Sequence, residues 1–368
     1  MIEVADILRR HGPQYRQQHP LLPSQQKVLE DLVRCRTVAC GGQLYRCDQC
    51  AQEHYSYHSC GNRHCPKCQR QQSERWLEQQ RVRLLPCAYY LLTFTLPQGL
   101  RALAWSHQEV LYGLLLQSAA RALQRLAWDP KYVGGQLAML AVLHTWTRAL
   151  LYHPHVHLLV SAGGLSEDGQ HWMAARNAAF LVPCFALSKI FRGKFRSAIK
   201  KLGWLGQVPP AVWKNNWVVH CQHAGQGQKV LDYLGRYVFR VAISNSRIER
   251  FEAGAVSFRY RDNRTHQIQH VGLSAEQFIG RFLQHVLPRG LVKVRSYGLA
   301  AAHCADKLQQ ARALLEAPTP DSQPQPQPLT LGQNSSTTPD PPPRLCPACK
   351  RGHLILIASL LPQRTRAP

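Results

Sequence analysis

At 368 residues the chain is long enough to bury a large core, and we expect it to form two or three structural units. Lys and Arg number 45 against 21 Asp and Glu, and the formal net charge of +24 indicates a polyanionic partner. The first residues do not have the pattern of a signal peptide, and the longest apolar run, residues 84–97, is too short to span a bilayer. Thirteen cysteines, several in Cys-x-x-Cys pairs, favour metal binding over disulfides, so we expect a cytoplasmic protein without membrane contact.

Residues 1–34 are predicted to be helical, with Ser24 as a candidate N-cap. They precede a predicted zinc-binding and DNA-binding module, residues 35–85, in which two Cys-x-x-Cys pairs are separated by 14 residues. Four thiolates at this spacing can surround one tetrahedral, structural Zn²⁺. The predicted ligands are Cys47, Cys50, Cys65 and Cys68. The alternatives for one member of the second pair are Cys60 and His64.

Basic residues make this module a candidate DNA-binding surface, and a solvated basic face is the alternative. The candidate contacts in the module are Arg63, Lys67 and Arg70. A second basic stretch, residues 185–202, has the pattern of an amphipathic helix that either follows a phosphate backbone or is simply solvated.

A new unit, residues 86–245, opens with a β-rich stretch over residues 88–96, which predicts a core strand between two prolines. Ser106 is predicted to cap the helix that follows, because a glutamate stands three residues later. Further strands are predicted over residues 139–147 and 213–219.

The most informative stretch of this unit is His153-Pro154-His155-Val156-His157. In a strand, alternate side chains share a face, so the imidazoles of His155 and His157 would lie side by side while Val156 anchors the strand in the core. Neutral imidazole suits a divalent cation. We therefore predict a metal site here, although a His-x-His pair on its own is more often an ordinary strand feature.

A later helix, predicted over residues 229–238, carries Tyr233 and Tyr237 four positions apart, so that both hydroxyls project from one face. A metal held by the histidines could polarise a phosphodiester, and a tyrosine hydroxyl could attack phosphorus to form a covalent phosphotyrosine. Amphipathic packing in the core is the alternative role for the tyrosines. The candidate DNA contacts around this helix are Lys229, Arg236 and Arg240.

The C-terminal part is predicted to contain three segments. Residues 246–316 form a DNA-binding or accessory region, which includes a helix capped by Ser274. Residues 317–344 have the composition of a disordered linker, and residues 345–368 form a tail with a partial zinc pattern. The pattern is Cys346-x2-Cys349-x3-His353.

Five stretches together resemble the rolling-circle insertion-sequence transposases with paired tyrosines, the IS-ninety-one type of the HUH endonuclease superfamily. They are RHCPKCQ (63–69), FTLP (94–97), LHTW (143–146), HPHVHLLVSAGG (153–164) and VLDYLGRYVFRVAIS (230–244). The resemblance implies an α+β fold, in which a small zinc-binding module precedes an HUH nuclease domain with a central antiparallel sheet flanked by helices.

The resemblance further implies cleavage of single-stranded DNA and strand transfer through a 5′-phosphotyrosine, with Mg²⁺ or Mn²⁺ as the catalytic cofactor. It also implies a bacterial protein that is associated with the nucleoid. By position, His155 and His157 match the family's metal ligands, and Tyr233 and Tyr237 match its nucleophiles. A related replication initiator or relaxase is disfavoured, because no nucleotide-binding motif accompanies these residues, and no nucleotide cofactor is expected. A non-catalytic zinc-dependent DNA-binding protein, such as a decayed transposase, is the alternative from another class.

One position departs from the family pattern. A glutamine often stands seven residues before the first ligand histidine and supplies a third ligand, and here that position is Arg148, which cannot ligate a cation. The alternatives for the third ligand are His144, His153 and Gln222, and the sequence does not choose between them.

Overall fold

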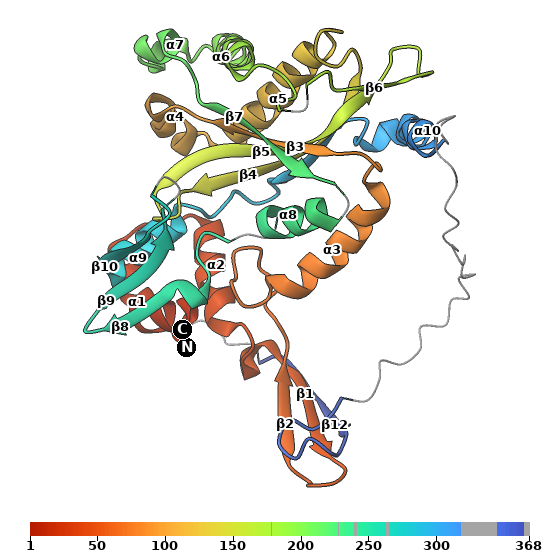
Figure 1. The fold of residues 1–368 in the computed structure, drawn as a ribbon. Coiled ribbons are helices and arrows are strands. Elements are labelled where there is room, and N and C mark those ends of the chain that lie inside the picture. Colours follow the sequence, from red (N-terminus) through yellow and green to blue (C-terminus); the bar gives the residue numbers. More distant parts are fainter. Residues whose placement is uncertain (178, 227, 239–240, 263–264, 318–343, 364–368) are drawn as a thin grey trace.

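The computed structural model describes the chain except residues 178, 227, 239–240, 263–264, 318–343 and 364–368, and it leaves out the side chains of residues 69–73, 75, 228, 231, 233, 236 and 237. Within the described part, three antiparallel sheets organise the molecule (Figure 1). None of the described helices is both long and apolar enough to cross a membrane.

The largest sheet has six strands, in the order β11-β4-β5-β3-β7, with β6 paired to β5. Its strands are β3 (Tyr89–Thr95), β4 (Gln136–Trp146), β5 (Tyr152–Leu165), β6 (Trp172–Ala174), β7 (Val219–Gly225) and β11 (Val294–Gly298). Ten successive residues of β4 are buried, because both faces of this central strand are covered.

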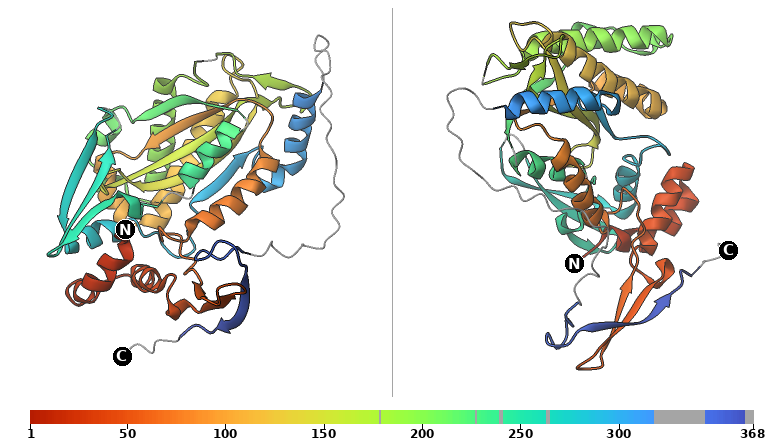
Figure 2. Two further views of the ribbon diagram at one scale, coloured as in Figure 1. Left: turned by 60° about the horizontal axis from the view of Figure 1, so that its bottom comes forward. Right: turned by 90° about the vertical axis from the view of Figure 1, so that its right-hand side faces the viewer.

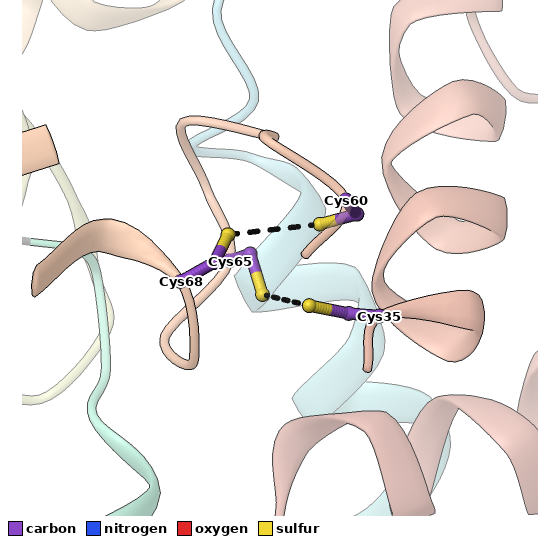
Figure 3. Close-up of side chains that lie close together, drawn as sticks. All are labelled: Cys35, Cys60, Cys65 and Cys68. Carbon is purple, nitrogen blue, oxygen red and sulfur yellow. Dashed lines mark hydrogen bonds between the residues drawn. The ribbon is translucent and has the colours of Figure 1, made fainter. Parts of the chain in front are cut away.

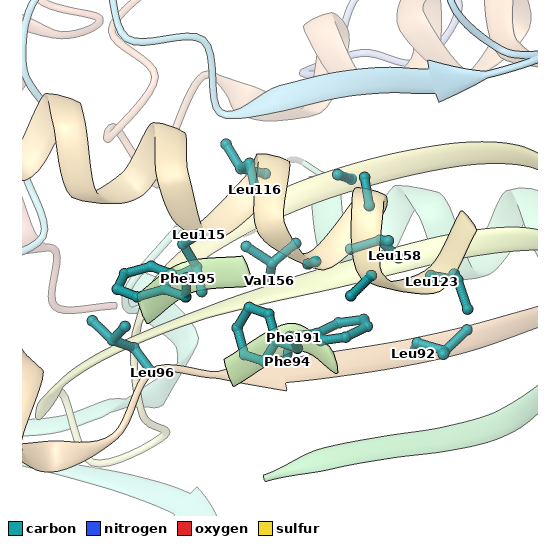
Figure 4. Packing of buried hydrophobic residues seen from close by; sticks show 14 of the residues in the cluster. Leu92, Phe94, Leu96, Leu115, Leu116, Leu123, Val156, Leu158, Phe191 and Phe195 are labelled. Carbon is teal, nitrogen blue, oxygen red and sulfur yellow. The ribbon is translucent and has the colours of Figure 1, made fainter. Parts of the chain in front are cut away.

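Helices cover the two faces of the central sheet differently. On one face, α5 (Gln108–Ala127) and α6 (Cys184–Lys201) bury the main core, in which Phe94 and Val156 of the sheet lie among leucines and phenylalanines of the helices (Figure 4). On the other face lies α8 (Gln228–Val238), which also packs against α3 (Gln69–Arg83). Short helices α4 (Arg101–Ser106) and α7 (Ala211–Lys214) flank the sheet, and α10 (Ala305–Glu316) packs near β5 and β6.

A second core joins the start of the chain to residues far along it. Helices α1 (Val4–Gln18) and α2 (Pro23–Arg34) share this core with α9 (Ala275–Leu283) and with a three-stranded sheet. The strands of this sheet are β8 (Ile248–Glu252), β9 (Ala255–Arg261) and β10 (Ile268–Ser274). The N-terminal helices therefore belong to the same packed body as the C-terminal region.

The third sheet is built from both ends of the chain. It has the order β12-β1-β2, with β1 (Gly42–Cys47), β2 (Glu53–Tyr57) and β12 (Leu354–Leu360). The views of Figure 2 show β12, in blue, lying beside the red and orange N-terminal strands, away from the central sheet. Short 3₁₀ turns connect several elements, at Val38–Cys40, Gln98–Leu100, Leu205–Gln207, Asn245–Arg247 and Ala302–Cys304.

The α+β class and the central antiparallel sheet are confirmed, whereas three local predictions are wrong. Helix α2 starts at Pro23, whose fixed φ suits a first helical position, so Ser24 lies inside the helix. Ser106 ends α4, where its hydroxyl donates to the carbonyl oxygen of Ala102 at 3.2 Å, and α5 starts only at Gln108. Residues 213–219 are not a strand, because α7 ends at 214 and β7 starts at 219. The predicted capping box at Ser274 is confirmed.

Candidate metal centres

Three histidines meet on one face of the central sheet. His144 of β4 stands directly opposite His155 of β5, and the register places Val142 opposite His157. One ring nitrogen from each histidine lies within 4.8 Å of the other two. His144 is buried and its ring stacks on Trp146 at 4.7 Å between centroids, whereas the other two histidines are half-buried. The structure therefore brings the two predicted ligand histidines together with one of the candidates for the third position.

Hydrogen bonds orient the rings of this histidine cluster. His155 Nδ1 donates to the carbonyl oxygen of His153 at 2.7 Å, so in the neutral ring Nε2 carries the lone pair. His157 Nδ1 lies 3.0 Å from the hydroxyl oxygen of Thr93 on β3. Backbone and side-chain oxygens commonly orient metal-ligating histidines in this way. Three convergent imidazoles fit a divalent cation of the first transition series, such as Mn²⁺, better than they fit the oxygen-preferring Mg²⁺.

The other candidates for the third ligand are placed differently. Arg101 donates to His153 Nδ1 at 2.7 Å, and burial together with the arginine charge lowers the pKa of His153. Gln222 lies on β7, which is separated from β5 by β3. Arg148 donates to the carbonyl oxygen of Arg261 at 2.6 Å. The geometry therefore favours His144.

Helix α8 covers the sheet face on which the histidine cluster lies. Its buried residues Val230, Leu234 and Val238 pack in one apolar cluster with sheet residues that include Val142 and Leu159. Val142 is two residues from His144, and Leu159 is two residues from His157, so strand alternation places them on the histidine face. Tyr233 and Tyr237 belong to α8, but their side chains lie outside the described residues.

A first cysteine cluster consists of Cys35, Cys60, Cys65 and Cys68 (Figure 3). The Sγ atoms of Cys35 and Cys65 are 3.5 Å apart, and those of Cys60 and Cys68 are 3.8 Å apart. Thiolates about 2.3 Å from a tetrahedral Zn²⁺ are separated by about 3.8 Å, so these spacings fit a structural zinc site. Three of the four cysteines are buried in the core shared with α1, α2 and α9.

A second cysteine cluster consists of Cys47, Cys50, Cys346 and Cys349. The prediction of one zinc site made from Cys47, Cys50, Cys65 and Cys68 is therefore wrong, because its two pairs belong to separate clusters. Cys60 is a full member of the first cluster, and Cys35 was missed because it lies 25 residues before Cys60 in the chain. His353, which the sequence pattern included, is not a member of the second cluster, and its main-chain N–H donates to Asp48 at 2.8 Å.

Two predicted DNA contacts are engaged within the chain. The Arg63 guanidinium donates to the carbonyl oxygens of Leu291 at 2.6 Å and Pro288 at 2.8 Å. The Lys67 ammonium pairs with the carboxylate of Glu3. These contacts give Arg63 and Lys67 roles within the fold, and their contact with DNA stays a prediction. Lys229 is exposed at the start of α8. The side chains of Arg70 and Arg236, and all of Arg240, lie outside the described residues.

Sequence reasoning missed an arginine cluster beside the turn between β4 and β5. It lines a cavity of about 270 Å³, and the lining residues are Arg148, Arg247, Arg259, Tyr260, Arg261 and Ile268. No acidic side chain among the described residues lines this cavity. The lining residue Arg259 forms an ion pair with Glu249, with 4.0 Å between nitrogen and oxygen. Several guanidinium groups around one cavity suit a phosphate, because each offers a fork of donors and a permanent charge.

The burial of His285 should make the stability of the protein depend on pH. Burial lowers the pKa of His285 from 6.5 to about 4. Between these values the unfolded chain takes up a proton that the folded chain does not, so the free energy of unfolding should fall as the pH is lowered from about 6.5 to about 4. We expect His285→Asn to remove part of this slope in urea denaturation at a series of pH values. An unchanged slope in the variant would contradict a neutral His285 in the folded protein.

Comparison with known proteins places the chain in a family. A family model described as a putative transposase matches residues 138–307, which include the histidine cluster and α8, and a model described as a transposase zinc-binding domain matches residues 7–96. The chain belongs to the IS91-type transposases. This confirms the resemblance seen in the sequence.

Two relatives are similar over most of their length. The putative transposase y4qJ of Sinorhizobium fredii is 39% identical over 377 residues, which cover 96% of this chain and 94% of the relative. The transposase for insertion sequence element IS801 of Pseudomonas savastanoi pv. phaseolicola is 30% identical over 320 residues, which cover 81% of this chain and 76% of the relative. No solved structure matches the chain significantly.

Proposed function

We propose that the chain cleaves single-stranded DNA at the ends of a mobile element and transfers the strand through a covalent 5′-phosphotyrosine. The observation that supports this most directly is the position of α8. The helix that carries Tyr233 and Tyr237 packs on the sheet face that carries the histidine cluster. A nucleophile and a metal site on facing elements are what a metal-assisted transesterification requires.

The proposed step conserves the energy of the phosphodiester bond. A tyrosine hydroxyl oxygen bonds to phosphorus and loses its proton, the bond between phosphorus and the 3′-oxygen breaks, and that oxygen leaves as a hydroxyl after gaining a proton. Neither water nor a nucleotide is consumed. With two tyrosines, two successive transesterifications are possible. One cleaves the donor strand and the other cleaves the target.

His144, His155 and His157 are the residues that would hold the divalent cation. When bound, Mg²⁺ or Mn²⁺ would polarise the scissile phosphate and stabilise the charge that develops on its oxygens. The fixed orientation of His155 and His157, through His153 and Thr93, keeps their ring nitrogens aimed at one point. With three imidazoles in the set, Mn²⁺ should support cleavage at lower concentration than Mg²⁺.

A nicking assay tests the proposal. Purified protein is incubated with labelled single-stranded DNA from the ends of the element and with Mg²⁺ or Mn²⁺, and the products are separated on a denaturing gel. We expect a protein-linked DNA band that needs metal and vanishes when Tyr233 and Tyr237 are both changed to phenylalanine. The band should persist in the control Tyr55→Phe, because Tyr55 is an exposed tyrosine on β2, away from the central sheet. DNA binding without a covalent band, across several end sequences and both metals, would instead favour the non-catalytic DNA-binding protein.

The arginine cluster is our candidate for the DNA-binding surface near this site. Changing both Arg259 and Arg261 to alanine should weaken single-stranded DNA binding and reduce the slope of log K against log[salt] by about 0.7 for each phosphate that the variant no longer neutralises. Arg125→Ala is the matched control, because Arg125 is an exposed arginine on α5 and does not line the cavity of the arginine cluster. Fluorescence anisotropy at several salt concentrations measures the binding. If the double alanine variant and the control both gave the wild-type slope, this role of the arginine cluster would be refuted.

A further inference from the structure

The second cysteine cluster joins the two ends of the chain. Cys47 is the last residue of β1 and Cys50 follows it, whereas Cys346 and Cys349 precede β12, about 300 residues later. The Sγ atoms of Cys47 and Cys349 are 3.7 Å apart, and those of Cys50 and Cys346 are 3.8 Å apart. Each distance matches the separation of about 3.8 Å expected between thiolates on one tetrahedral Zn²⁺, and exceeds the S–S bond of about 2.05 Å in a disulfide.

The two Cys-x-x-Cys turns have the same backbone conformation. In each, the residue directly after the second cysteine bonds back to the first: Ala51 N–H donates to the carbonyl oxygen of Cys47 at 3.1 Å, and Lys350 N–H donates to that of Cys346 at 2.9 Å. Ala51 and Lys350 both have a φ of 57°, a left-handed conformation that is uncommon for residues other than glycine. Two unrelated stretches of sequence therefore adopt one strained turn and present their thiols to one point.

Main-chain N–H groups also point at the sulfurs. Cys50 N–H donates to Cys47 Sγ at 3.4 Å, and Gly352 N–H donates to Cys349 Sγ at 3.3 Å. Such bonds stabilise thiolates, which are the form that ligates zinc. A Cβ atom at Gly352 would lie 2.5 Å from Cys47 Sγ, so only glycine permits this approach of the second turn to the first.

The strands extend the pairing beyond the sulfurs. β12 runs antiparallel to β1 along its whole length, from Leu354 opposite Cys47 to Leu360 opposite Gly42. Asp48 and His353 add reciprocal main-chain and side-chain bonds between the two turns. Two Cys-x-x-Cys turns on a three-stranded antiparallel sheet form a zinc ribbon, and here the N-terminal segment supplies one turn and the C-terminal segment supplies the other (Figure 2).

We propose that the chain binds a second structural Zn²⁺ through Cys47, Cys50, Cys346 and Cys349, and that this ion fastens the C-terminal segment to the N-terminal module. The matched zinc-binding family model ends at residue 96, so half of this ligand set lies outside it. The inference does not depend on the phosphotyrosine chemistry, because it concerns a separate set of residues. It changes the expected metal content of the purified protein from one structural zinc to two.

Metal content gives the first test. Full-length protein, purified without added chelator under reducing conditions, should contain two zinc ions per chain by atomic emission. Cys346→Ser combined with Cys349→Ser should lower the content to one, whereas Cys184→Ser, a change in a cysteine outside both clusters, should leave it at two. Gly352→Ala keeps all the thiols and should also lose one zinc, which separates a steric effect on the site from loss of ligands. A count of two in the double serine variant would overturn the proposal.

Chelator kinetics and mass spectrometry give the second test. Cys50 is exposed and Cys349 is half-buried, whereas three cysteines of the first cluster are buried, so a chromogenic chelator should remove zinc from wild-type protein in a fast and a slow phase. The fast phase should be absent from the double serine variant. Release in a single phase from the wild type would count against a second site. So would a disulfide between Cys47 and Cys349, detected after alkylation of the freshly purified protein.

Discussion

Changing both His155 and His157 to alanine should lower the rate of metal-dependent DNA cleavage by about 10³-fold or more, because a metal's charge stabilisation contributes several kcal/mol to such a transition state. The change removes two of the three imidazoles that converge on the sheet, and one remaining ligand cannot hold the cation. Both side chains are half-buried at the face of β5, so the strand and the main core beneath it should persist. Single-turnover cleavage across a Mn²⁺ titration measures the loss, and thermal unfolding checks the fold.

His223→Ala is the matched control for this prediction. His223 is an exposed histidine on the neighbouring strand β7, where it stands opposite Tyr90 and makes an edge-to-face contact with it. We expect the control to cleave at the wild-type rate. If the double alanine variant reached the wild-type rate at saturating Mn²⁺, the histidine cluster would not be the catalytic metal site, even if the tyrosines formed the covalent intermediate.

The histidine cluster and α8 could be predicted in part from the sequence because their signals are local. Strand alternation in residues 153–157 is enough to place His155 and His157 on one face, and the register of β4 then brings in His144, which the sequence offered only as one of three candidates. Helical spacing in residues 229–238 likewise predicts α8. The contact between α8 and the histidine face is a tertiary feature that no local pattern predicts.

The cysteines show why the rest could not be predicted. A Cys-x-x-Cys turn supplies two ligands, and nothing in its own sequence says which other pair completes the tetrahedron. The nearest pair was the natural prediction for Cys47 and Cys50, but β12 brings Cys346 and Cys349 to them from the far end of the chain. The number of ligands could have corrected the prediction. The tail contains only two cysteine ligands, so a zinc site there needs a second cysteine pair from elsewhere in the chain.

Charge patterns were similarly ambiguous about Arg63. A basic side chain in a zinc module suggests DNA, but the charge pattern does not show that this guanidinium also donates to the main-chain carbonyls of residues 288 and 291. The arginine cluster around Arg148 and Arg259 was invisible for the opposite reason. Its members are scattered through residues 148–261, and only the packing of the β8–β10 sheet beside the β4–β5 turn gathers them.

Of the two cysteine clusters, the first should contribute more to the stability of the protein, and Cys35→Ser tests this. Cys35 is fully buried at the end of α2, in the core that also contains α9, so its zinc would link the N-terminal helices, the loop with Cys60, and the start of α3. Because the free energy of binding a structural zinc is also folding free energy, the change should remove one zinc and lower the free energy of unfolding by more than about 3 kcal/mol.

Cys40→Ser provides the comparison, since Cys40 lies five residues further on, outside both clusters, and its thiol donates to the carbonyl oxygen of Arg34. Urea denaturation followed by tryptophan fluorescence, with zinc content measured on the same samples, distinguishes the two variants. A Cys35→Ser protein as stable as Cys40→Ser would mean that Cys60, Cys65 and Cys68 hold the zinc without it. The metal would then stabilise only the loop that contains these three cysteines, and apolar packing alone would attach α2 to the rest of this core.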